Sequence, residues 1–150
     1  LRTFSKAYGL AGLRVGIGVG DEELISLLDR IRMPFNVNLP AQRAAAEALK
    51  DRTFLKRSVS GVEKNREDLA AGLRSLGLAA VDSAANFLFV RGPLPGHILF
   101  RRLLHLGVII RALDEYGLPG HVRISVGSQT ENRFLIECLR KALEREGSPA

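Results

Sequence analysis

The feature that most constrains the fold is one long helical pattern in the middle of the chain. Apolar residues recur at helical spacing over residues 53–76, and the side expected to be buried carries Val59, Val62, Leu69 and Leu73. Gly77 follows at the place where a glycine commonly ends a helix. A helix of this length can span two domains, so we expect residues 53–77 to connect one part, residues 1–52, with another, residues 78–150.

The part before the long helix combines extended segments with shorter helices. We predict extended segments over residues 1–5 and 14–20, the second a buried strand in which Val15, Ile17 and Val19 alternate with glycines. A glycine-punctuated loop, residues 6–13, lies between them. Helices are predicted after the capping residue Asp21, where Pro34 follows the helix as a stop, and over residues 41–49, with Pro40 in the first turn.

The part after the long helix alternates short strands with helices. Strands are predicted over residues 86–90, 108–112 and 122–126, and one helix over residues 97–106, closed by Gly107. A capping box, Ser128 to Glu131, starts the last helix. Its predicted core face holds Phe134, Leu135, Cys138, Leu139 and Ala142. This pattern predicts a compact α+β unit, followed by a disordered tail at residues 147–150.

Composition narrows the classes of ligand. The net charge is +6, but the arginines are scattered and aromatics make up only 6% of residues, so a nucleic-acid surface is not expected. We expect no membrane span, because no apolar run is long enough. His97, His105 and His121 lack the spacing of metal ligands, so no metal is expected, and the single cysteine fits a reducing cytoplasm. Small phosphates and carboxylates are the favoured partners.

The loop around Lys6 combines an amine with groups that bind phosphate. Thr3 and Ser5 precede the lysine and Arg14 follows it. Hydroxyls and a guanidinium can hold a phosphate dianion, and a lysine on a fixed backbone can attack a carbonyl. On spacing alone, however, the favoured interpretation is that these residues are solvated surface side chains.

The segment from Arg2 to Gly16, RTFSKAYGLAGLRVG, resembles the lysine segment of histidinol-phosphate aminotransferases, which are fold-type I pyridoxal-phosphate enzymes. The resemblance implies that Lys6 binds pyridoxal 5′-phosphate covalently and moves a proton during catalysis. It also implies that Thr3, Ser5 and Arg14 contact the cofactor phosphate.

The resemblance continues through most of the chain, in PFNVN at residues 34–38, ANFLFV at 85–90, GVIIR at 107–111, YGLP at 116–119 and VRISVG at 122–127. It implies an α/β fold: the C-terminal part of the cofactor-binding large domain, residues 1–52, then the connecting helix and the small α+β domain. The first half of a family member, which supplies further cofactor contacts, has no counterpart here. A homodimer is implied for the full-length parent.

Three further residues are candidates for substrate binding. Arg123 lies in an Arg-x-Ser-x-Gly strand where the wider superfamily places a clamp for the anionic end of the substrate, although a solvent-facing charge is the alternative. Arg111 follows three branched residues in a predicted buried strand, so it is either a second phosphate contact or the partner of Asp114 or Glu115. Asn86 either contacts substrate or caps a turn.

The resemblance implies an aminotransferase that moves an amino group between glutamate or 2-oxoglutarate and histidinol phosphate or imidazole-acetol phosphate. Related enzymes with these motifs give an alternative, an aromatic aminotransferase or a threonine-phosphate decarboxylase. A different class of hypothesis is a folded module that is inactive because half of the active site is absent. We expect the fragment alone to be inactive.

Overall fold

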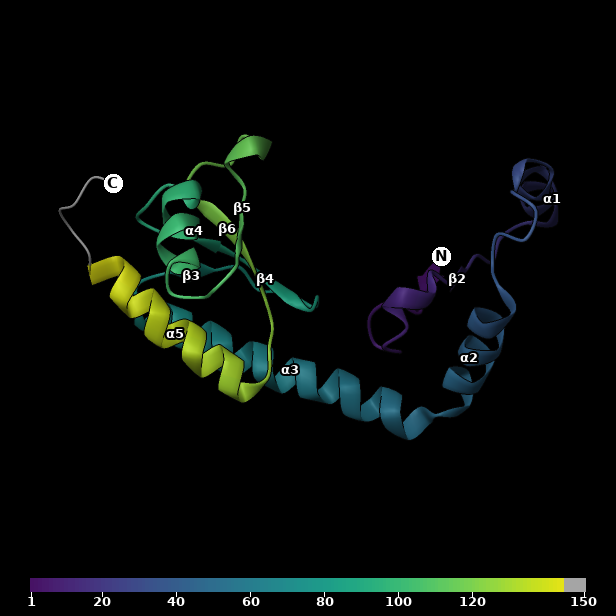
Figure 1. Ribbon diagram of the computed structural model, residues 1–150, viewed down its shortest axis with the longest axis horizontal. Coiled ribbons are helices and arrows are strands. Elements are labelled where there is room, and N and C mark those ends of the chain that lie inside the picture. The colour runs from purple at the N-terminus through teal and green to yellow at the C-terminus, as the bar shows by residue number, and fades with distance from the viewer. Residues whose placement is uncertain (145–150) are drawn as a thin grey trace. The chain divides into compact units, whose positions relative to one another are not determined.

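The computed structural model describes residues 1–144, which form two compact units. The first unit is Leu1–Ser60 and the second begins at Gly61. The boundary falls inside the longest helix, α3 (Arg52–Ser75), which confirms the long helix predicted from the sequence (Figure 1). No helix in the described part of the chain is both long and apolar enough to cross a membrane.

The first unit is built around a short hairpin. Strands β1 (Arg2–Thr3) and β2 (Gly16–Ile17) pair antiparallel, and the 3₁₀ turn η1 (Ala11–Leu13) lies in the loop between them. Helices α1 (Glu22–Ile31) and α2 (Leu39–Lys50) follow. The buried core of this unit is small and consists of Phe4, Val15, Ala41 and Ala45.

Capping residues fix the two helices of the first unit, at Asp21 as predicted and at Asn38, which was not predicted. The Asp21 carboxylate accepts a hydrogen bond from the Glu23 amide at 2.9 Å, and the Asn38 side chain does the same for Ala41 at 2.9 Å. Helix α1 nevertheless has no buried residue. Its apolar side is exposed to solvent, at Leu24, Leu27, Leu28 and Ile31.

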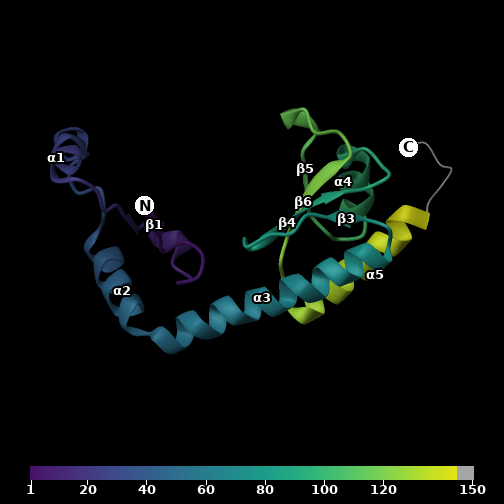
Figure 2. The same ribbon diagram turned by 180° about the vertical axis from the view of Figure 1, so that it is seen from behind.

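The second unit contains a four-stranded antiparallel sheet with the strand order β3-β4-β6-β5. The strands are β3 (Ala79–Ala80), β4 (Phe87–Arg91), β5 (Arg111–Ala112) and β6 (His121–Ser125). Figure 2 shows this sheet from behind. In β4 and β6 buried and partly exposed residues alternate strictly, so the two faces of the sheet have different chemistry.

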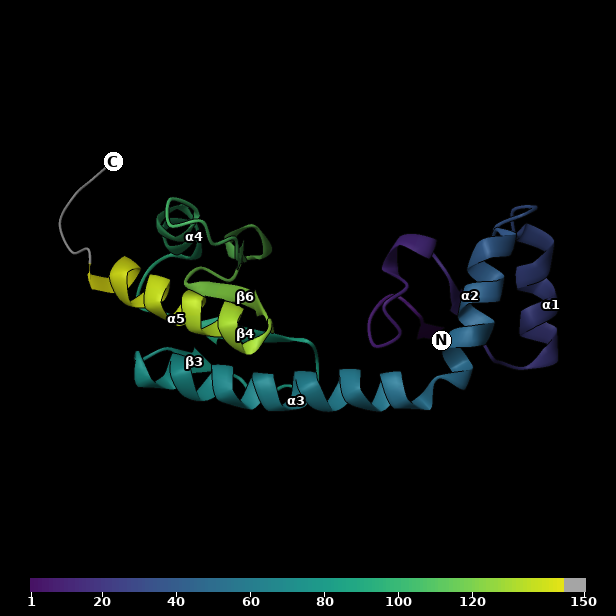
Figure 3. The same cartoon turned by 60° about the horizontal axis from the view of Figure 1, so that its bottom comes forward.

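One face of the sheet packs on helices, and this packing forms the main core. Residues Leu88, Val90, Val122 and Ile124 of the sheet are buried against apolar side chains of α3, α4 (Gly96–Leu104) and α5 (Gln129–Glu144). Helices α3 and α5 run alongside each other (Figure 3), and Gly72 of α3 lets Ile136 approach so closely that a Cβ there would lie 3.0 Å from its Cδ1. The other face, which we call the free face, carries the partly exposed residues of β4 and β6.

Several sequence predictions need correction. The second extended segment is not a buried strand, because Ile17 is 47% and Val19 88% exposed, and only Val15 is buried. Phe134 is 49% exposed and does not belong to the core face of α5. The strand predicted over residues 108–112 is shorter, Arg111–Ala112. Val59 of α3 is 40% exposed, whereas Leu69 and Leu73 are buried as predicted. The predicted disordered tail, residues 147–150, lies outside the described residues.

Candidate functional site

The Lys6 loop is held by a buried aromatic anchor. Phe4 is 2% exposed, and its ring lies 4.8 Å from that of Tyr8, measured between centroids. Its amide donates to the Val15 carbonyl at 3.2 Å, and its carbonyl accepts from the Leu10 amide at 3.0 Å. Lys6 lies two residues beyond this anchor. The backbone that delivers its amine is therefore fixed on both sides of the loop.

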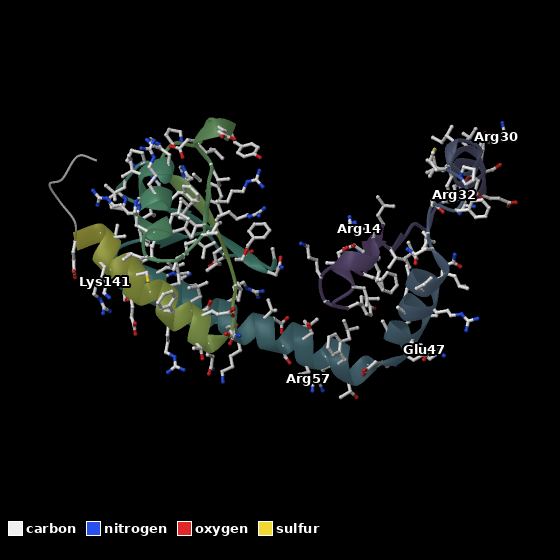
Figure 4. The ribbon with its side chains drawn as sticks, viewed as in Figure 1. Arg14, Arg30, Arg32, Glu47, Arg57 and Lys141 are labelled. Carbon is white, nitrogen blue, oxygen red and sulfur yellow. The ribbon has the colours of Figure 1, made fainter. Side chains whose placement is uncertain are left out.

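A glycine lets the two ends of this loop approach each other. Gly16 pairs with Thr3 across the hairpin, and a Cβ at Gly16 would lie 2.8 Å from the backbone oxygen of Arg2. Any side chain at this position would push the strands apart. Arg14 ends η1 with a positive φ of 54°, which an L-residue adopts only at an energetic cost. Figure 4 labels the Arg14 side chain. This turn sends Val15 into the core and leaves Arg14 exposed.

The four predicted cofactor residues all belong to this loop and its strands. The Thr3 hydroxyl oxygen accepts a hydrogen bond from the Ser5 amide at 3.0 Å, which leaves its O–H free to donate. One Nη of Arg14 donates to the Ala11 carbonyl at 2.7 Å, so the remaining guanidinium donors are free. The Lys6 amine is exposed and, within residues 1–144, has no hydrogen-bond or ion-pair partner. This set of donors fits a phosphate together with a reactive amine.

A second candidate site lies on the free face of the sheet in the second unit. Arg123 is the central residue of β6, directly opposite Phe89 of β4 on one side and Arg111 of β5 on the other. Directly opposed residues of antiparallel strands share a face. The Arg123 guanidinium also lies 5.2 Å from the Phe87 ring centroid. Two cations and two aromatic rings therefore share this face, which we call the arginine face.

No carboxylate neutralises the arginine face within the described residues. Arg111 donates a hydrogen bond to the Tyr116 hydroxyl and lies 5.3 Å from the centroid of that ring. The alternative in which Arg111 pairs with Asp114 or Glu115 is not found within residues 1–144, where Asp114 bonds His97 instead. The prediction of a buried Arg111 is wrong, because this residue is exposed. Like charges directly opposite each other are destabilising unless an anion lies between them. Arg111 and Arg123 are therefore candidates for binding an anion.

The turn beside the arginine face is fixed by a carboxylate. Asp114 begins the 3₁₀ turn η2 (Asp114–Tyr116), and its Oδ1 lies 2.9 Å from Nδ1 of His97 near the start of α4. This hydrogen bond from His97 holds the pKa of the Asp114 carboxyl below its ordinary value. The second carboxylate oxygen is buried without a hydrogen-bond partner among residues 1–144. It lies near Gly96, where the N-cap residue Pro95 provides no side-chain cap.

Asn86, the third substrate candidate, directly precedes β4. Its backbone carbonyl accepts from the Val126 amide at 2.9 Å, which extends the pairing of β4 with β6. Its side chain is exposed and has no hydrogen-bond partner in the described part of the chain. The structure therefore gives Asn86 no turn-capping side-chain bond, and the residue stays a candidate.

Sequence reasoning missed the aromatic and histidine members of the arginine face. Phe87 and Phe89 lie on it because they alternate with the buried Leu88 and Val90. His121 stacks on Phe89 with 4.9 Å between ring centroids. Strand periodicity alone could have found these residues, because period two places positions 87, 89, 121 and 123 on the non-core face once 88, 90, 122 and 124 are assigned to the core.

Comparisons with known proteins agree with this architecture. The family model described as aminotransferase class I and II matches residues 1–139. The chain is 46% identical over 143 residues to a histidinol-phosphate aminotransferase of Nitratidesulfovibrio vulgaris (strain Hildenborough), covering 95% of this chain and 38% of the relative. It is 45% identical to histidinol-phosphate aminotransferase 2 of Pseudomonas fluorescens (strain Pf0-1), covering 96% and 39%. The chain thus spans about two fifths of the length of these relatives.

Solved structures give the same result. The histidinol-phosphate aminotransferase of Clostridium acetobutylicum matches with a TM-score of 0.88 and 25% identity, covering 93% of this chain and 44% of that chain. The Sinorhizobium meliloti enzyme, solved in complex with pyridoxal-5′-phosphate, matches with a TM-score of 0.83 and 30% identity, covering 95% and 40%. An L-threonine-O-3-phosphate decarboxylase of Porphyromonas gingivalis matches with a TM-score of 0.83 and 27% identity, covering 95% and 46%.

The relatives and the solved structures each match at least 93% of this chain. The mixed α/β fold predicted from the sequence is confirmed by these structural matches. With the family model covering 139 of 150 residues, the chain belongs to the aminotransferase class I and II family.

Proposed function

We propose that this chain carries the covalent lysine and the anion-binding arginines of a pyridoxal-phosphate-dependent aminotransferase. The proposed reaction moves an amino group between glutamate or 2-oxoglutarate and histidinol phosphate or imidazole-acetol phosphate. The observation that carries the proposal is the opposition of Arg111 and Arg123 on adjacent strands, with no neutralising carboxylate among the described residues. The names of the relatives support the choice of a phosphate-bearing substrate.

In the first unit, the chain's own groups bind the cofactor and move a proton. Pyridoxal phosphate, when bound, supplies the electron sink that allows an amino group and a neighbouring proton to be transferred. The free donors of Thr3, Ser5 and Arg14 would hold its phosphate. The Lys6 amine would attach to it covalently and then act as base and acid. Because the loop is fixed by Phe4, the backbone that carries this amine needs little reordering.

In the second unit, the arginine face would bind the anionic end of each substrate. A guanidinium can present two parallel N–H donors to a carboxylate or a phosphate, so one face serves both half-reactions. The aromatic neighbours of Arg123 and Arg111 hold the two guanidiniums from the side, at 5.2 and 5.3 Å from ring centroids. The face is therefore ordered before any ligand arrives. Asn86, exposed next to β4, is proposed as a further substrate contact.

The covalent step is testable on the chain itself. The chain is mixed with pyridoxal phosphate, reduced with borohydride, digested and analysed by mass spectrometry. Because the chain spans about two fifths of its relatives' length, we expect only a weak cofactor adduct on Lys6 in the wild-type chain, and its loss in Lys6→Ala. Lys56→Ala is the matched control, because Lys56 is likewise an exposed lysine, on α3. Labelling spread evenly over the lysines, and unchanged in Lys6→Ala, would contradict the assignment of Lys6.

One alternative substrate has a specific observation in its favour. The match to L-threonine-O-3-phosphate decarboxylase covers as much of this chain as the match to the Sinorhizobium meliloti aminotransferase, 95% in each case. That name also implies a phosphate-bearing ligand, so the arginine face does not separate the two reactions. Assays of the full-length protein would separate them: release of carbon dioxide from threonine phosphate, without transamination of histidinol phosphate, would favour the decarboxylase.

A further inference from the structure

We infer that Tyr116 is a further anion-binding residue of the arginine face, and that its hydroxyl makes this face prefer a tetrahedral phosphate to a planar carboxylate. The inference rests on the proposed function of that face and adds a residue that selects between its two classes of ligand. It comes from the contacts of the Tyr116 hydroxyl, a group that the proposed reaction has not used so far.

The hydroxyl of Tyr116 has a free proton beside a cation of the site. It accepts a hydrogen bond from Arg111 Nη2, so its lone pair is engaged with the guanidinium. A phenol that accepts a hydrogen bond still has its own O–H to donate. No acceptor for that O–H is present among residues 1–144. Tyr116 therefore adds a neutral donor next to the charged donor of Arg111.

The turn that carries Tyr116 is ordered, although the residue is 58% exposed. Its amide donates to the Leu113 carbonyl at 3.0 Å, and Gly117 closes the turn in the left-handed region with a bond to the Asp114 carbonyl at 3.0 Å. The bond of Asp114 to His97 ties the same turn to α4. Because the side chain is already placed, binding loses little conformational entropy here.

The geometry of the anions explains the preference. A carboxylate has two oxygens in one plane, and two guanidiniums can satisfy both of them. A phosphate monoester has a third terminal oxygen outside the plane of the other two, which requires a donor from another direction. The Tyr116 O–H can supply that donor. Its removal should therefore weaken phosphate binding more than carboxylate binding.

The test is a site-resolved titration of the ¹⁵N-labelled chain by NMR, with inorganic phosphate and, separately, with acetate. The amides of Phe89, Arg111 and Arg123 report on the arginine face, and those of the Lys6 loop are recorded apart from them. In Tyr116→Phe we expect phosphate to bind roughly tenfold more weakly, about 1.4 kcal/mol, at the lower end for a hydrogen bond to a charged group. Acetate binding should change less than about twofold.

A matched control and a separate variant make the outcomes distinct. Tyr8→Phe removes the other tyrosine hydroxyl of the chain, in the first unit, and should leave both titrations of the arginine face unchanged. Arg123→Gln should abolish phosphate binding at that face if the proposed function is right. Retention of phosphate binding in Arg123→Gln, or no wild-type response of these amides, would refute the anion face and this inference with it.

Two results would overturn the inference about Tyr116 alone, given that Arg123→Gln loses phosphate binding. The first is an unchanged phosphate affinity in Tyr116→Phe. The second is an equal loss for phosphate and acetate, which would mean that Tyr116 only positions Arg111 and selects nothing. Phenylalanine keeps the ring that lies 5.3 Å from Arg111, so the variant removes the hydroxyl without removing the aromatic contact.

Discussion

Two glycine-to-alanine substitutions test the packing around the Tyr116 turn, because we expect one to lower and the other to raise the free energy of unfolding. Gly96 is the buried first residue of α4, and a Cβ there would lie 2.5 Å from Asp114 Oδ2 and 2.7 Å from the His121 carbonyl oxygen. The carboxylate could move only by giving up its bond to His97. The carbonyl belongs to β6, the strand that carries Arg123. Gly96→Ala therefore overpacks a region that has no flexible group to yield.

The magnitude follows from the competing terms. Overpacking of this kind costs about 1–3 kcal/mol, while replacing glycine by alanine in a helix gains roughly 0.5–1 kcal/mol. The gain is smaller at the first position of a helix, so we expect Gly96→Ala to lower the free energy of unfolding by about 2 kcal/mol. At Gly61, inside α3, an added Cβ would meet nothing within 4 Å, so Gly61→Ala should gain roughly 0.5–1 kcal/mol.

Urea unfolding followed by circular dichroism measures both changes. With a denaturant slope of about 2 kcal/mol/M, Gly96→Ala should lower the midpoint by about 1 M and Gly61→Ala should raise it by about 0.3–0.5 M. Amide exchange of Val90 and Val122, in the central strands of the second unit, gives an independent value for Gly96→Ala. An unchanged or raised stability in Gly96→Ala, with Gly61→Ala behaving as expected, would refute the packing argument.

Three further predictions concern other parts of the chain. The folded-state pKa of Asp114 lies below its ordinary value of 3.8, so its ionised form stabilises the fold above that pH, and this contribution is lost as pH falls through the lowered pKa. In unfolding experiments at acid pH, the free energy of unfolding should therefore depend less steeply on pH in Asp114→Asn than in the wild-type chain. Equal slopes would count against the His97 bond. Leu139 is 0% exposed in the main core, and Leu139→Ala should lower the free energy of unfolding by about 2–5 kcal/mol, measured by thermal or urea unfolding. The exposed apolar side of α1 should cause concentration-dependent association in sedimentation velocity, reduced by Leu27→Glu, at a position that is 51% exposed; a monomer at all concentrations would contradict this.

Local signals in the sequence predicted the helices well. The caps at Asp21 and at Ser128 to Glu131 are formed as expected, with the Ser128 amide donating to Glu131 Oε2 at 2.7 Å. These signals act within a few residues, so no tertiary information is needed to interpret them. The strand Ala79–Ala80 was missed because alanine favours strands weakly and only pairing with β4 defines it.

Tertiary packing decided what periodicity could not. Phe134 directly precedes Leu135 on α5, at the edge of the apolar stripe. The sequence does not show how far along this edge other elements pack against the helix. Similarly, the apolar sides of α1 and of α3 near Val59 are visible as patterns, but a pattern does not say whether anything lies against it. Exposure at these positions is therefore a finding of the structure.

The candidate site also has one part that could be predicted from the sequence and one part that could not. The residues of the Lys6 loop are close in sequence, so their grouping could be predicted from spacing and from family resemblance. Arg111 and Arg123, by contrast, are opposed only because β5 and β6 pair in one particular register. A turn between the two strands then returns Tyr116 to Arg111. Single-sequence reasoning does not fix strand register, so this second grouping required the structure.

Because of the strict alternation in β6, a single strand register places both its apolar core residues and Arg123. A shift of this strand by one residue would turn Arg123 toward the helices and bring Val122 and Ile124 out to water. A misaligned molecule would thus lose its apolar core and its guanidinium pair in a single error. A chain misaligned in this way would therefore be unstable as well as unable to place Arg123 opposite Arg111.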